Sequence, residues 1–465
     1  MKPVKLSLLL LLLLSLSLRL SPQEQNDDIV FVRKIANIIR NSNSLLYNFH
    51  FLTKDIGARL SGSPAMYNSE QWVKYQMKKA GADSVWLQSC KVSHWERGGQ
   101  DSVFLSFTDN DGKTIRRKTN TAALGRSIGS GEKGLRAGII RIDSFEELDK
   151  PGIDVSGKIV FFNPRFRENE NPIDEYSKLA KYRTNGAAFA AKHGAKGVIV
   201  RSLTNSIDTS PHTGVQYYEP DLPQIPAAAI STIDADFLDQ LCNDGKQVEA
   251  EIYTHGRILP DTIGHNVIGE IRGSEYPSGY ITIGAHLDSW DIGEGASDDG
   301  TGVVITLETL RVLKESGYRP KHTLRFVLFA DEENGLKGAN AYAEMAKERN
   351  EQHVFAIESD SGCFPPLSIG LVGLASESVQ RLDSLTDLFK PYGGVTFINR
   401  GAADISPLNQ AFKTPLAALW SDQLQYFRVH HSTNDTFENA DVNSIKLGAI
   451  DTIIMLYLAE KYLLY

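Results

Sequence analysis

The sequence predicts an α/β fold: a mixed, largely parallel sheet flanked by helices, with an inserted β-rich domain. Three apolar runs rich in β-branched and aromatic residues alternate with helix-like stretches, as buried parallel strands do: residues 280–288, 323–333 and 353–362. Acidic residues or a histidine stand at the end of each run. Because the carboxyl ends of such strands open onto one crevice, residues far apart in the sequence can converge there.

Length and charge narrow the class of protein. The chain has 465 residues, of which 42% are hydrophobic and 23% are charged, so we expect a soluble main domain with a companion or inserted domain. A formal net charge of −8 argues against a protein that binds nucleic acid by neutralising phosphates.

Residues 1–20 are predicted to be a secretory signal peptide. Lys2 and Lys5 precede a run rich in Leu and Ser from Leu6 to Leu18, which is shorter than the ~20 residues that a membrane span needs. The alternative for this run is a signal anchor. We expect a secreted or lumenal protein, the lysosome included, without a membrane span after signal removal.

The remaining chain divides where the sequence pattern changes. Residues 21–50 predict an N-terminal helix that could belong to a propeptide, because apolar positions recur at helical spacing. Residues 117–255 carry short strands and polar loops without a cluster of metal-type ligands, so they predict an inserted domain. Residues 51–116 and 256–465 are assigned to the main domain that holds the candidate site.

The three cysteines are not expected to bind metal. Cys90, Cys242 and Cys363 form no CxxC pair, and their odd number leaves at least one thiol free or intermolecular. Each is interpreted as a small buried hydrophobic residue. The sequon at Asn434 lies in a candidate active-site motif, so we expect no glycan there.

The segment 286–302 (HLDSWDIGEGASDDGTG) contains the first candidate ligands. His286 ends a strand, and Asp288 points to the same face, where its carboxylate can accept a hydrogen bond from the imidazole. Asp298 precedes a helix-like stretch, and a carboxylate there can bridge two metal ions while the helix N-terminus offsets its charge. A lone HxD at a strand end is usually structural, but the Asp-Asp-Gly loop that follows favours a metal site.

Two adjacent acids follow the second run. Glu332 and Glu333 stand at a strand terminus, so one can bind a metal ion while the other reaches a water beside it. Such pairs on solvated loops are often inert, but this pair supplies the ligand and base that the 286–302 segment lacks. We assign Glu333 as a ligand and Glu332 as the general base.

At the two remaining candidate ligand positions, the sequence leaves two residues to choose between. Asp360 follows the third run, and Glu358 on the same face is the alternative ligand. His430 and His431 are adjacent and would face opposite sides of a strand, so only one could bind metal. The other would contact substrate or pack in the core.

The ligand types predict zinc, with manganese or cobalt as possible substitutes, because histidine, aspartate and glutamate occur without cysteine. Two Zn²⁺ ions ~3.5–4 Å apart would share Asp298 and a water whose pKa falls toward ~7. Glu332 would take the proton from that water and pass it to the leaving amine. The expected reaction is hydrolysis of a peptide bond.

These motifs together resemble those of the co-catalytic zinc exopeptidases of the aminopeptidase family. The resemblance covers nearly the whole chain after the leader, and the matching segments are GARLSGSPA (57–65), HLDSWDIGEGASDDGTG, ADEENG, ESDSG and HHSTNDT. It implies that His286 and Asp360 hold one zinc ion and that Glu333 and His431 hold the other. Asp298 would bind both ions.

The resemblance further implies that Asp288 and Glu332 form the catalytic pair. It favours His431 over His430, because the family pattern has a histidine four residues before Asp435. The inserted region would be a protease-associated domain, and the protein a secreted or vesicular homodimer. One departure is the STN that follows the two histidines, where the family would have another histidine; it puts details of the substrate pocket in doubt.

The leading hypothesis is therefore a secreted metallo-exopeptidase, of the carboxypeptidase or dipeptidase class, that hydrolyses dipeptides or short peptides. Two alternatives use the same fold: a non-catalytic receptor or scaffold, and a single-zinc acyltransferase or cyclase. The pattern leaves open which end of the peptide is recognised.

Overall fold

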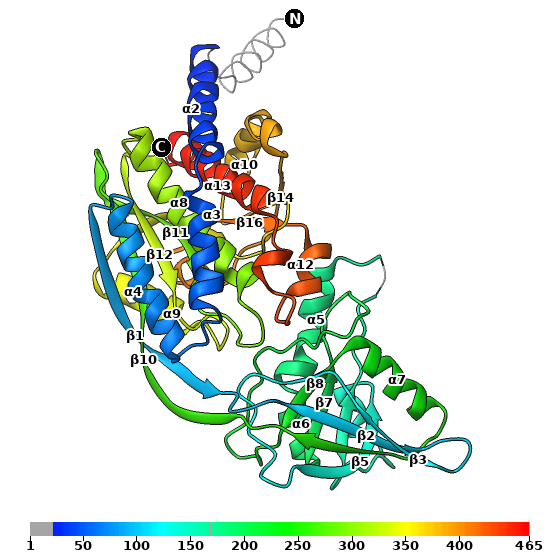
Figure 1. Ribbon diagram of the computed structural model, residues 1–465. Coiled ribbons are helices and arrows are strands. Elements are labelled where there is room, and N and C mark those ends of the chain that lie inside the picture. The colour runs from blue at the N-terminus through cyan, green and yellow to red at the C-terminus, as the bar shows by residue number, and fades with distance from the viewer. Residues whose placement is uncertain (1–21, 168, 465) are drawn as a thin grey trace, which may run out of the picture.

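The structure is a computed structural model that describes residues 22–167 and 169–464, and its strands form two sheets (Figure 1). The predicted signal peptide, residues 1–20, lies outside the described residues. The strands of the first sheet are β1 (Ser84–Glu96), β10 (Arg257–Ile271), β11 (Tyr276–His286), β12 (His322–Phe329), β13 (Gln352–Ser359), β14 (Pro366–Val372), β15 (Thr396–Ile398) and β16 (Leu416–Ser421).

The three predicted strands form the parallel centre of this sheet. Its order is β1-β10-β12-β11-β13-β16-β14-β15, and β11 pairs in parallel with both β12 and β13. Every residue of β12 is buried, as expected for a strand covered on both faces. The pairs β1–β10, β10–β12 and β14–β16 are antiparallel, so the sheet is mixed and the predicted fold class is confirmed.

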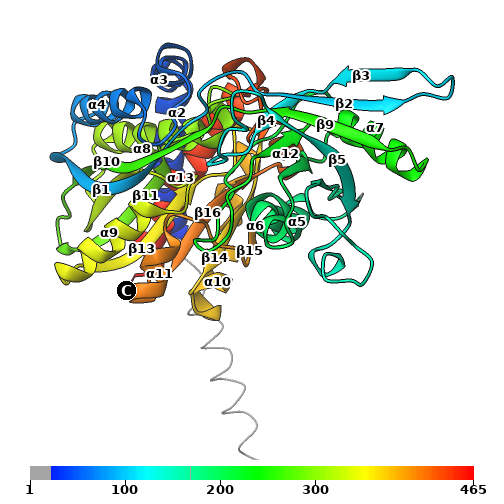
Figure 2. The same ribbon diagram turned by 90° about the horizontal axis from the view of Figure 1, so that it is seen from below.

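Helices cover both faces of the first sheet (Figure 2). The alternation of side chains along a strand explains this, since Val267 and Ile268 of β10 belong to apolar clusters on opposite faces. One face packs against α4 (Pro64–Lys79), α8 (Thr301–Ser316) and α13 (Val442–Tyr462), while α2 (Pro22–Arg40) packs on α8 and α13 and α3 (Ser44–His50) packs on α8. The other face packs against α9 (Lys337–Glu348) and α11 (Ser406–Phe412). Helix α10 (Ser376–Asp383) contacts α13, and α12 (Gln423–Val429) lies beside a second lobe of the molecule, which holds the second sheet.

The N-terminal segment forms two helices, α2 and α3, that are packed onto the body of the first lobe. Asp28 of α2 is fully buried, and its carboxylate accepts hydrogen bonds from Tyr457 (2.6 Å), Lys461 (2.5 Å) and Tyr462 (2.7 Å) of α13. Phe31 stacks on Tyr457 with ring centroids 4.3 Å apart. The N-terminal helix is therefore fixed to the C-terminal helix.

The second sheet lies in a separate lobe (Figure 1). Its strands are β2 (Ser102–Thr108), β3 (Thr114–Lys118), β4 (Thr121–Ala123), β5 (Leu135–Ile142), β6 (Ile159–Phe162), β7 (Gly197–Arg201), β8 (Ala227–Ile230) and β9 (Val248–Tyr253), in the order β3-β2-β9-β5-β6-β7-β8-β4. Its helices are α5 (Pro172–Thr184) and α6 (Gly186–Lys192), which contribute to one apolar cluster, and α7 (Thr232–Asn243), which contributes to another.

The second sheet begins earlier than the sequence predicted. Residues 102–116 were assigned to the peptidase-like domain with the boundary at 117, but β2 pairs with β9 and β3, so both strands belong to the second sheet. Alternating hydrophobic residues show that a strand is present but not which sheet it joins, which explains the error.

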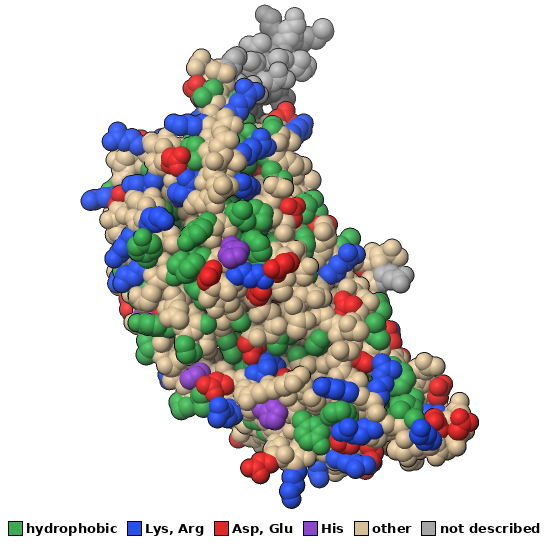
Figure 3. Space-filling view, viewed as in Figure 1, with side chains coloured by type: hydrophobic (Ala, Val, Ile, Leu, Met, Phe, Trp, Pro, Cys, Tyr) green, Lys and Arg blue, Asp and Glu red, His purple; other side chains and the backbone are tan. Residues whose placement is uncertain are grey.

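Within the described residues, α13 is the one helix long and apolar enough to cross a bilayer. Of its most apolar 18-residue stretch, 72% is buried inside the protein, as in the core helix of a folded domain. Lys, Arg, Asp and Glu side chains intermingle on the face seen in Figure 3.

All three cysteines are free, and burial raises the pKa of Cys90 and of Cys363 to about 12. These two match the prediction of small buried residues, whereas Cys242 is only half-buried.

Candidate metal centre and active site

The carboxyl ends of the parallel strands bring the candidate residues together. His286 is the last residue of β11, Glu333 lies in the turn after β12, and Asp360 directly follows β13. Asp298 comes from the loop that leads into α8, where it is joined to Asp299 by a cis peptide bond. The expected convergence at this edge of the sheet is therefore present.

Asp298 lies between two histidines. Its Oδ1 is 3.1 Å from His286 Nε2, and its Oδ2 is 3.1 Å from His431 Nε2. On the first side, Asp360 Oδ1 is 3.5 Å from His286 Nε2; on the second side, Glu333 Oε2 is 3.0 Å from His431 Nε2. The five residues thus form two three-residue groups that share one carboxylate.

The donor set fits divalent metal ions. Asp360 Oδ1 and Glu333 Oε1 are buried and make no hydrogen bond with the described part of the chain. Buried carboxylate oxygens are costly without a donor or a cation. Imidazole nitrogen and carboxylate oxygen are donors that zinc accepts in proteins, and no cysteine lies in either group.

The two adjacent histidines do not face opposite sides of a strand, so that expectation was wrong. They follow the short helix α12, and their rings stack with centroids 3.6 Å apart and planes inclined by 20°. His431 has a left-handed φ of 59°, which turns its ring alongside that of His430.

Both histidines approach the shared carboxylate. His430 Nε2 is 3.6 Å from Asp298 Oδ2, so these three residues could also surround one ion. We favour His431 because its shorter contacts reach both Asp298 and Glu333. Burial lowers the pKa of His430 well below its ordinary value, whereas the carboxylates of Glu333 and Asp298 outweigh burial and raise that of His431.

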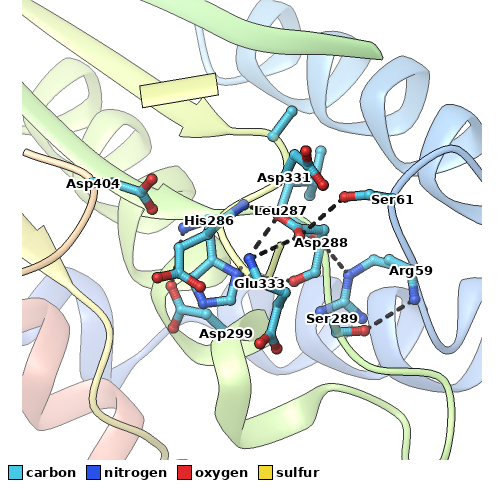
Figure 4. Close-up of polar contacts among 12 residues, drawn as sticks. Arg59, Ser61, His286, Leu287, Asp288, Ser289, Asp299, Asp331, Glu333 and Asp404 are labelled. Atoms are coloured by element: carbon cyan, nitrogen blue, oxygen red, sulfur yellow. Dashed lines mark hydrogen bonds and ion pairs between the residues drawn. The ribbon is translucent and has the colours of Figure 1, made fainter. Parts of the chain in front are cut away.

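The Asp288 carboxylate binds the backbone of the neighbouring turn more closely than it binds the His286 imidazole. The Nδ1 atom of His286 is 3.0 Å from the Asp288 carbonyl oxygen but 3.8 Å from its carboxylate. The carboxylate accepts the amide hydrogens of Glu332 (3.1 Å) and Glu333 (3.3 Å) and the hydroxyl hydrogen of Ser61 (3.1 Å). These bonds occupy it and hold the turn with the two glutamates (Figure 4).

Glu332 and Glu358 take different positions. The Glu332 side chain lines the cavity described below, and burial together with Glu333 and Asp360 raises its pKa well above the ordinary value. Glu358, the alternative to Asp360, accepts the amide hydrogens of residues 404 and 405 at 3.3 and 2.9 Å. Glu358 is absent from the two groups of described residues whose ligand atoms lie close enough to surround one ion, which are His286, Asp298 and Asp360, and Asp298, His430 and His431.

Four residues that support the site were not singled out from the sequence. Arg59 and Ser61 lie in the 57–65 segment, which carried only part of the resemblance and no assigned role. Asp299 Oδ2 accepts the amide hydrogen of His286 (3.2 Å), and Asp435 accepts the amide hydrogens of residues 297 and 298. The only signal in the sequence was their place within quoted motifs.

A cavity of about 530 Å³ opens beside the metal-type residues, between the two lobes. Its wall includes Tyr176, Arg183 and Tyr217 from the second lobe, and Trp420 and Tyr426 from the first. Among the described residues that line it, Arg183 is the one Arg or Lys.

Comparison with known proteins agrees with this geometry. Residues 266–455 match the model of peptidase family M28. Carboxypeptidase Q of Bos taurus is 32% identical over 94% of this chain and 90% of that protein, and carboxypeptidase Q of Homo sapiens is 34% identical over 87% and 83%. The chain belongs to peptidase family M28.

Solved structures of M28 proteins and related peptidases share the fold of this M28 chain. A peptidase M28 precursor from Shewanella amazonensis superposes with a TM-score of 0.85 at 30% identity, over 93% of this chain and 97% of that one. A zinc aminopeptidase from Bacillus subtilis has the same fold, with a TM-score of 0.63 at 21% identity over 89% and 94%. The M28 chain is a carboxypeptidase Q-like metallo-exopeptidase.

Proposed function

We propose that this M28 peptidase is a secreted or lumenal enzyme with two Zn²⁺ ions per chain, which hydrolyses dipeptides or short peptides with a metal-activated water. The observation that carries the proposal is Asp298, whose two carboxylate oxygens each lie 3.1 Å from a different histidine. A carboxylate in that position can bridge two cations.

The residues divide between the two ions as their contacts suggest. His286 and Asp360 would hold the first ion, Glu333 and His431 the second, and Asp298 both. When bound, two such ions lower the pKa of the attacking water and stabilise the oxygen atoms that gain charge during peptide hydrolysis.

Glu332 is the proposed general base. Its carboxylate lines the same cavity as Glu333 and Asp360, so it can take a proton from the attacking water and return it to the leaving amine. Asp288 is the proposed partner in catalysis, and its bonds to the amides of Glu332 and Glu333 support a role in orienting that turn.

We infer that the enzyme recognises the free carboxylate of its peptide, as a carboxypeptidase does. Arg183 is 5% exposed, and its Nη2 donates to the Tyr176 hydroxyl at 2.8 Å. Its Nη1 lies 3.5 Å from the Thr213 carbonyl oxygen and 3.3 Å from His431 Nδ1. Its Nε is buried without a hydrogen-bond partner, and none of its contacts among the described residues is with a carboxylate. A buried guanidinium of this kind suits an anionic group, which it can bind in a bidentate manner.

The organisation of the chain is proposed on the same basis. Residues 1–20 would be removed as a signal peptide, and the second lobe would be a protease-associated domain that closes the cavity. The buried contacts of Asp28 favour helices in residues 22–50 that stay attached rather than a discarded propeptide. The homodimer rests on the resemblance alone.

One experiment tests both the class of enzyme and the end of the peptide that it recognises. A dipeptide, its N-acetylated form and its amidated form are incubated with the enzyme, with and without a chelator, and the zinc content is measured. We expect two zinc ions, loss of activity on chelation, and cleavage that fails only when the carboxyl end is blocked. Absence of bound zinc would favour the receptor or scaffold alternative, and one zinc with cyclised products would favour the cyclase alternative.

A further inference from the structure

The segment that carries His430 and His431 is held by the second lobe. Residues 202–213, which follow β7 of the second sheet, run beside residues 427–433, which comprise the end of α12 and the segment after it in the first lobe. An antiparallel bridge joins residues 212 and 432. The first lobe therefore supplies the histidines, but a loop of the other lobe lies against their backbone.

Both histidine carbonyl groups are bound from this loop. His212 Nδ1 is 2.6 Å from the His430 carbonyl oxygen, and the Thr213 amide donates to the His431 carbonyl oxygen at 2.8 Å. Two hydroxyl groups extend the contact. Thr204 Oγ1 donates to the Phe427 carbonyl oxygen at 2.6 Å, and Ser210 Oγ lies 2.9 Å from the hydroxyl oxygen of residue 433.

The backbone of His431 needs such support. Its φ of 59° is left-handed, a conformation that is uncommon for residues other than glycine and less favourable for them than the right-handed region. Its ring direction follows from this backbone conformation, because the Cα–Cβ bond turns with it. The two carbonyl contacts on either side of its peptide unit therefore restrain where His431 Nε2 lies relative to Asp298.

His212 is a buried hydrogen-bond donor whose ring hydrogen is fixed on one nitrogen atom. It is 2% exposed, and its Nδ1 faces a carbonyl oxygen, so the neutral ring carries its hydrogen on that atom. Burial lowers its pKa to about 4, which keeps the ring neutral. Among the described residues, the ring of His212 makes its hydrogen bond to the peptide backbone, and its Nε2 is buried without a partner.

We propose that His212 is a positioning residue that fixes the zinc ligand His431 through the backbone of the 430–431 segment. The second lobe thereby forms part of the metal centre as well as a wall of the cavity. This inference rests on the proposed role of His431 as a ligand. Loss of the donor should loosen one zinc ion while leaving the other group, His286 with Asp360, in place.

The test compares His212→Leu, which removes the donor at similar volume, with His212→Asn, which keeps an N–H near the position of Nδ1. The matched control is His353→Leu, since His353 is also buried but lies at the far end of β13. Zinc stoichiometry and the Kd of each ion are measured by chelator competition, and the cobalt-substituted proteins are compared by their visible absorption spectra.

We expect His212→Leu to weaken the more loosely held zinc ion by about 10-fold or more, in the range seen when groups behind a metal ligand are removed. The cobalt spectrum should change, His212→Asn should restore most of the affinity, and His353→Leu should leave both Kd values unchanged. If His212→Leu does not fold, Thr204→Val takes the same measurement and should weaken the same ion. Wild-type Kd values and an unchanged spectrum in the folded variant would overturn the inference.

The two proposals can fail separately. If the wild-type protein binds fewer than two zinc ions, or His431→Ala retains both, the proposed metal centre is wrong. If His431→Ala loses one ion while His212→Leu keeps both, the metal centre stands and only the positioning role of His212 is wrong.

Discussion

Arg59 and Ser289 bind each other in both directions. The Arg59 amide donates to Ser289 Oγ at 2.9 Å, and the Ser289 amide donates to the Arg59 carbonyl oxygen at 3.2 Å. The Arg59 guanidinium also donates to the carbonyl oxygens of Leu287, Glu294 and Gly295, at 2.7, 3.0 and 2.8 Å (Figure 4 draws Arg59, Leu287 and Ser289). One arginine thus closes the loop between His286 and Asp298.

We expect Arg59→Lys to open this loop. Lysine keeps the charge but cannot donate along the several directions that the planar guanidinium uses. Because Arg59 is fully buried, the loss of several hydrogen bonds to a charged group should cost about 2–4 kcal/mol of unfolding free energy and reduce zinc occupancy. Urea unfolding and metal analysis measure both quantities.

The control for that variant is Arg257→Lys. Arg257 pairs with Glu96 on the surface, with its side chain 66% exposed, so its replacement should change stability by less than about 0.5 kcal/mol. Equal effects of the two substitutions would show that the loop does not depend on Arg59.

Glu332→Gln should retain both zinc ions and lose turnover. The amide matches the carboxylate in shape but cannot accept the proton, so kcat should fall by about 10²–10⁴-fold while the zinc content stays at the wild-type value. Steady-state kinetics on a dipeptide and metal analysis test this. Glu348→Gln, on the exposed end of α9, is the control, and a wild-type kcat in Glu332→Gln would remove Glu332 from the role of base.

The convergence of the candidate ligands could be predicted because local sequence determines where a strand ends. Buried runs such as 280–288 and 353–362 become parallel strands, and the acids or histidine that follow them reach one edge of the sheet. The contacts of Arg59 could not be predicted, since they join residues more than 220 positions apart to backbone carbonyls, which carry no sequence signal.

The conformation of the two histidines was also beyond the sequence. An HH pair on a strand would point in opposite directions, and the stacked arrangement requires the left-handed φ of His431, which a loop from the second lobe supports. The start of the second sheet at residue 102 was missed for a related reason, because strand pairing is decided by distant partners.

Alanine substitutions of His430 and His431 should have different effects on zinc affinity. His431→Ala removes a proposed ligand and should lower the affinity for one zinc ion by more than about 100-fold, beyond the effect of losing a group behind a ligand. His430→Ala should keep both ions, because His430 lies farther from Asp298 and has no ion-pair contact with Glu333 among the described residues. Zinc titration of both variants measures the difference. Loss of one ion in His430→Ala but not in His431→Ala would reverse the assignment.

Glu351→Gln should destabilise the protein in a pH-dependent way. Burial alone would raise the pKa of Glu351, but hydrogen bonds with His353 (3.3 Å) and Arg325 (2.5 Å) outweigh it and lower the pKa from 4.5 to about 2. A carboxylate with a lower pKa in the folded state stabilises that state above its unfolded pKa, and this contribution is lost as the pH falls from about 4.5 toward 2. At pH 7 the variant should lose about 3 kcal/mol, because a pKa difference of about 2.5 units at about 1.4 kcal/mol each sets an upper bound of about 3.5 kcal/mol.

Urea unfolding of the chelated proteins at pH 7, 5, 4 and 3 measures this without interference from zinc release. The gap between the wild type and Glu351→Gln should be constant between pH 7 and pH 5 and should narrow below pH 4.5. Glu344→Gln serves as the control, since the Glu344 side chain is 68% exposed and its loss should change stability by less than about 0.5 kcal/mol at each pH. A gap that stays constant down to pH 3 would show that the Glu351 carboxylate is not stabilised by Arg325 and His353 in the folded protein.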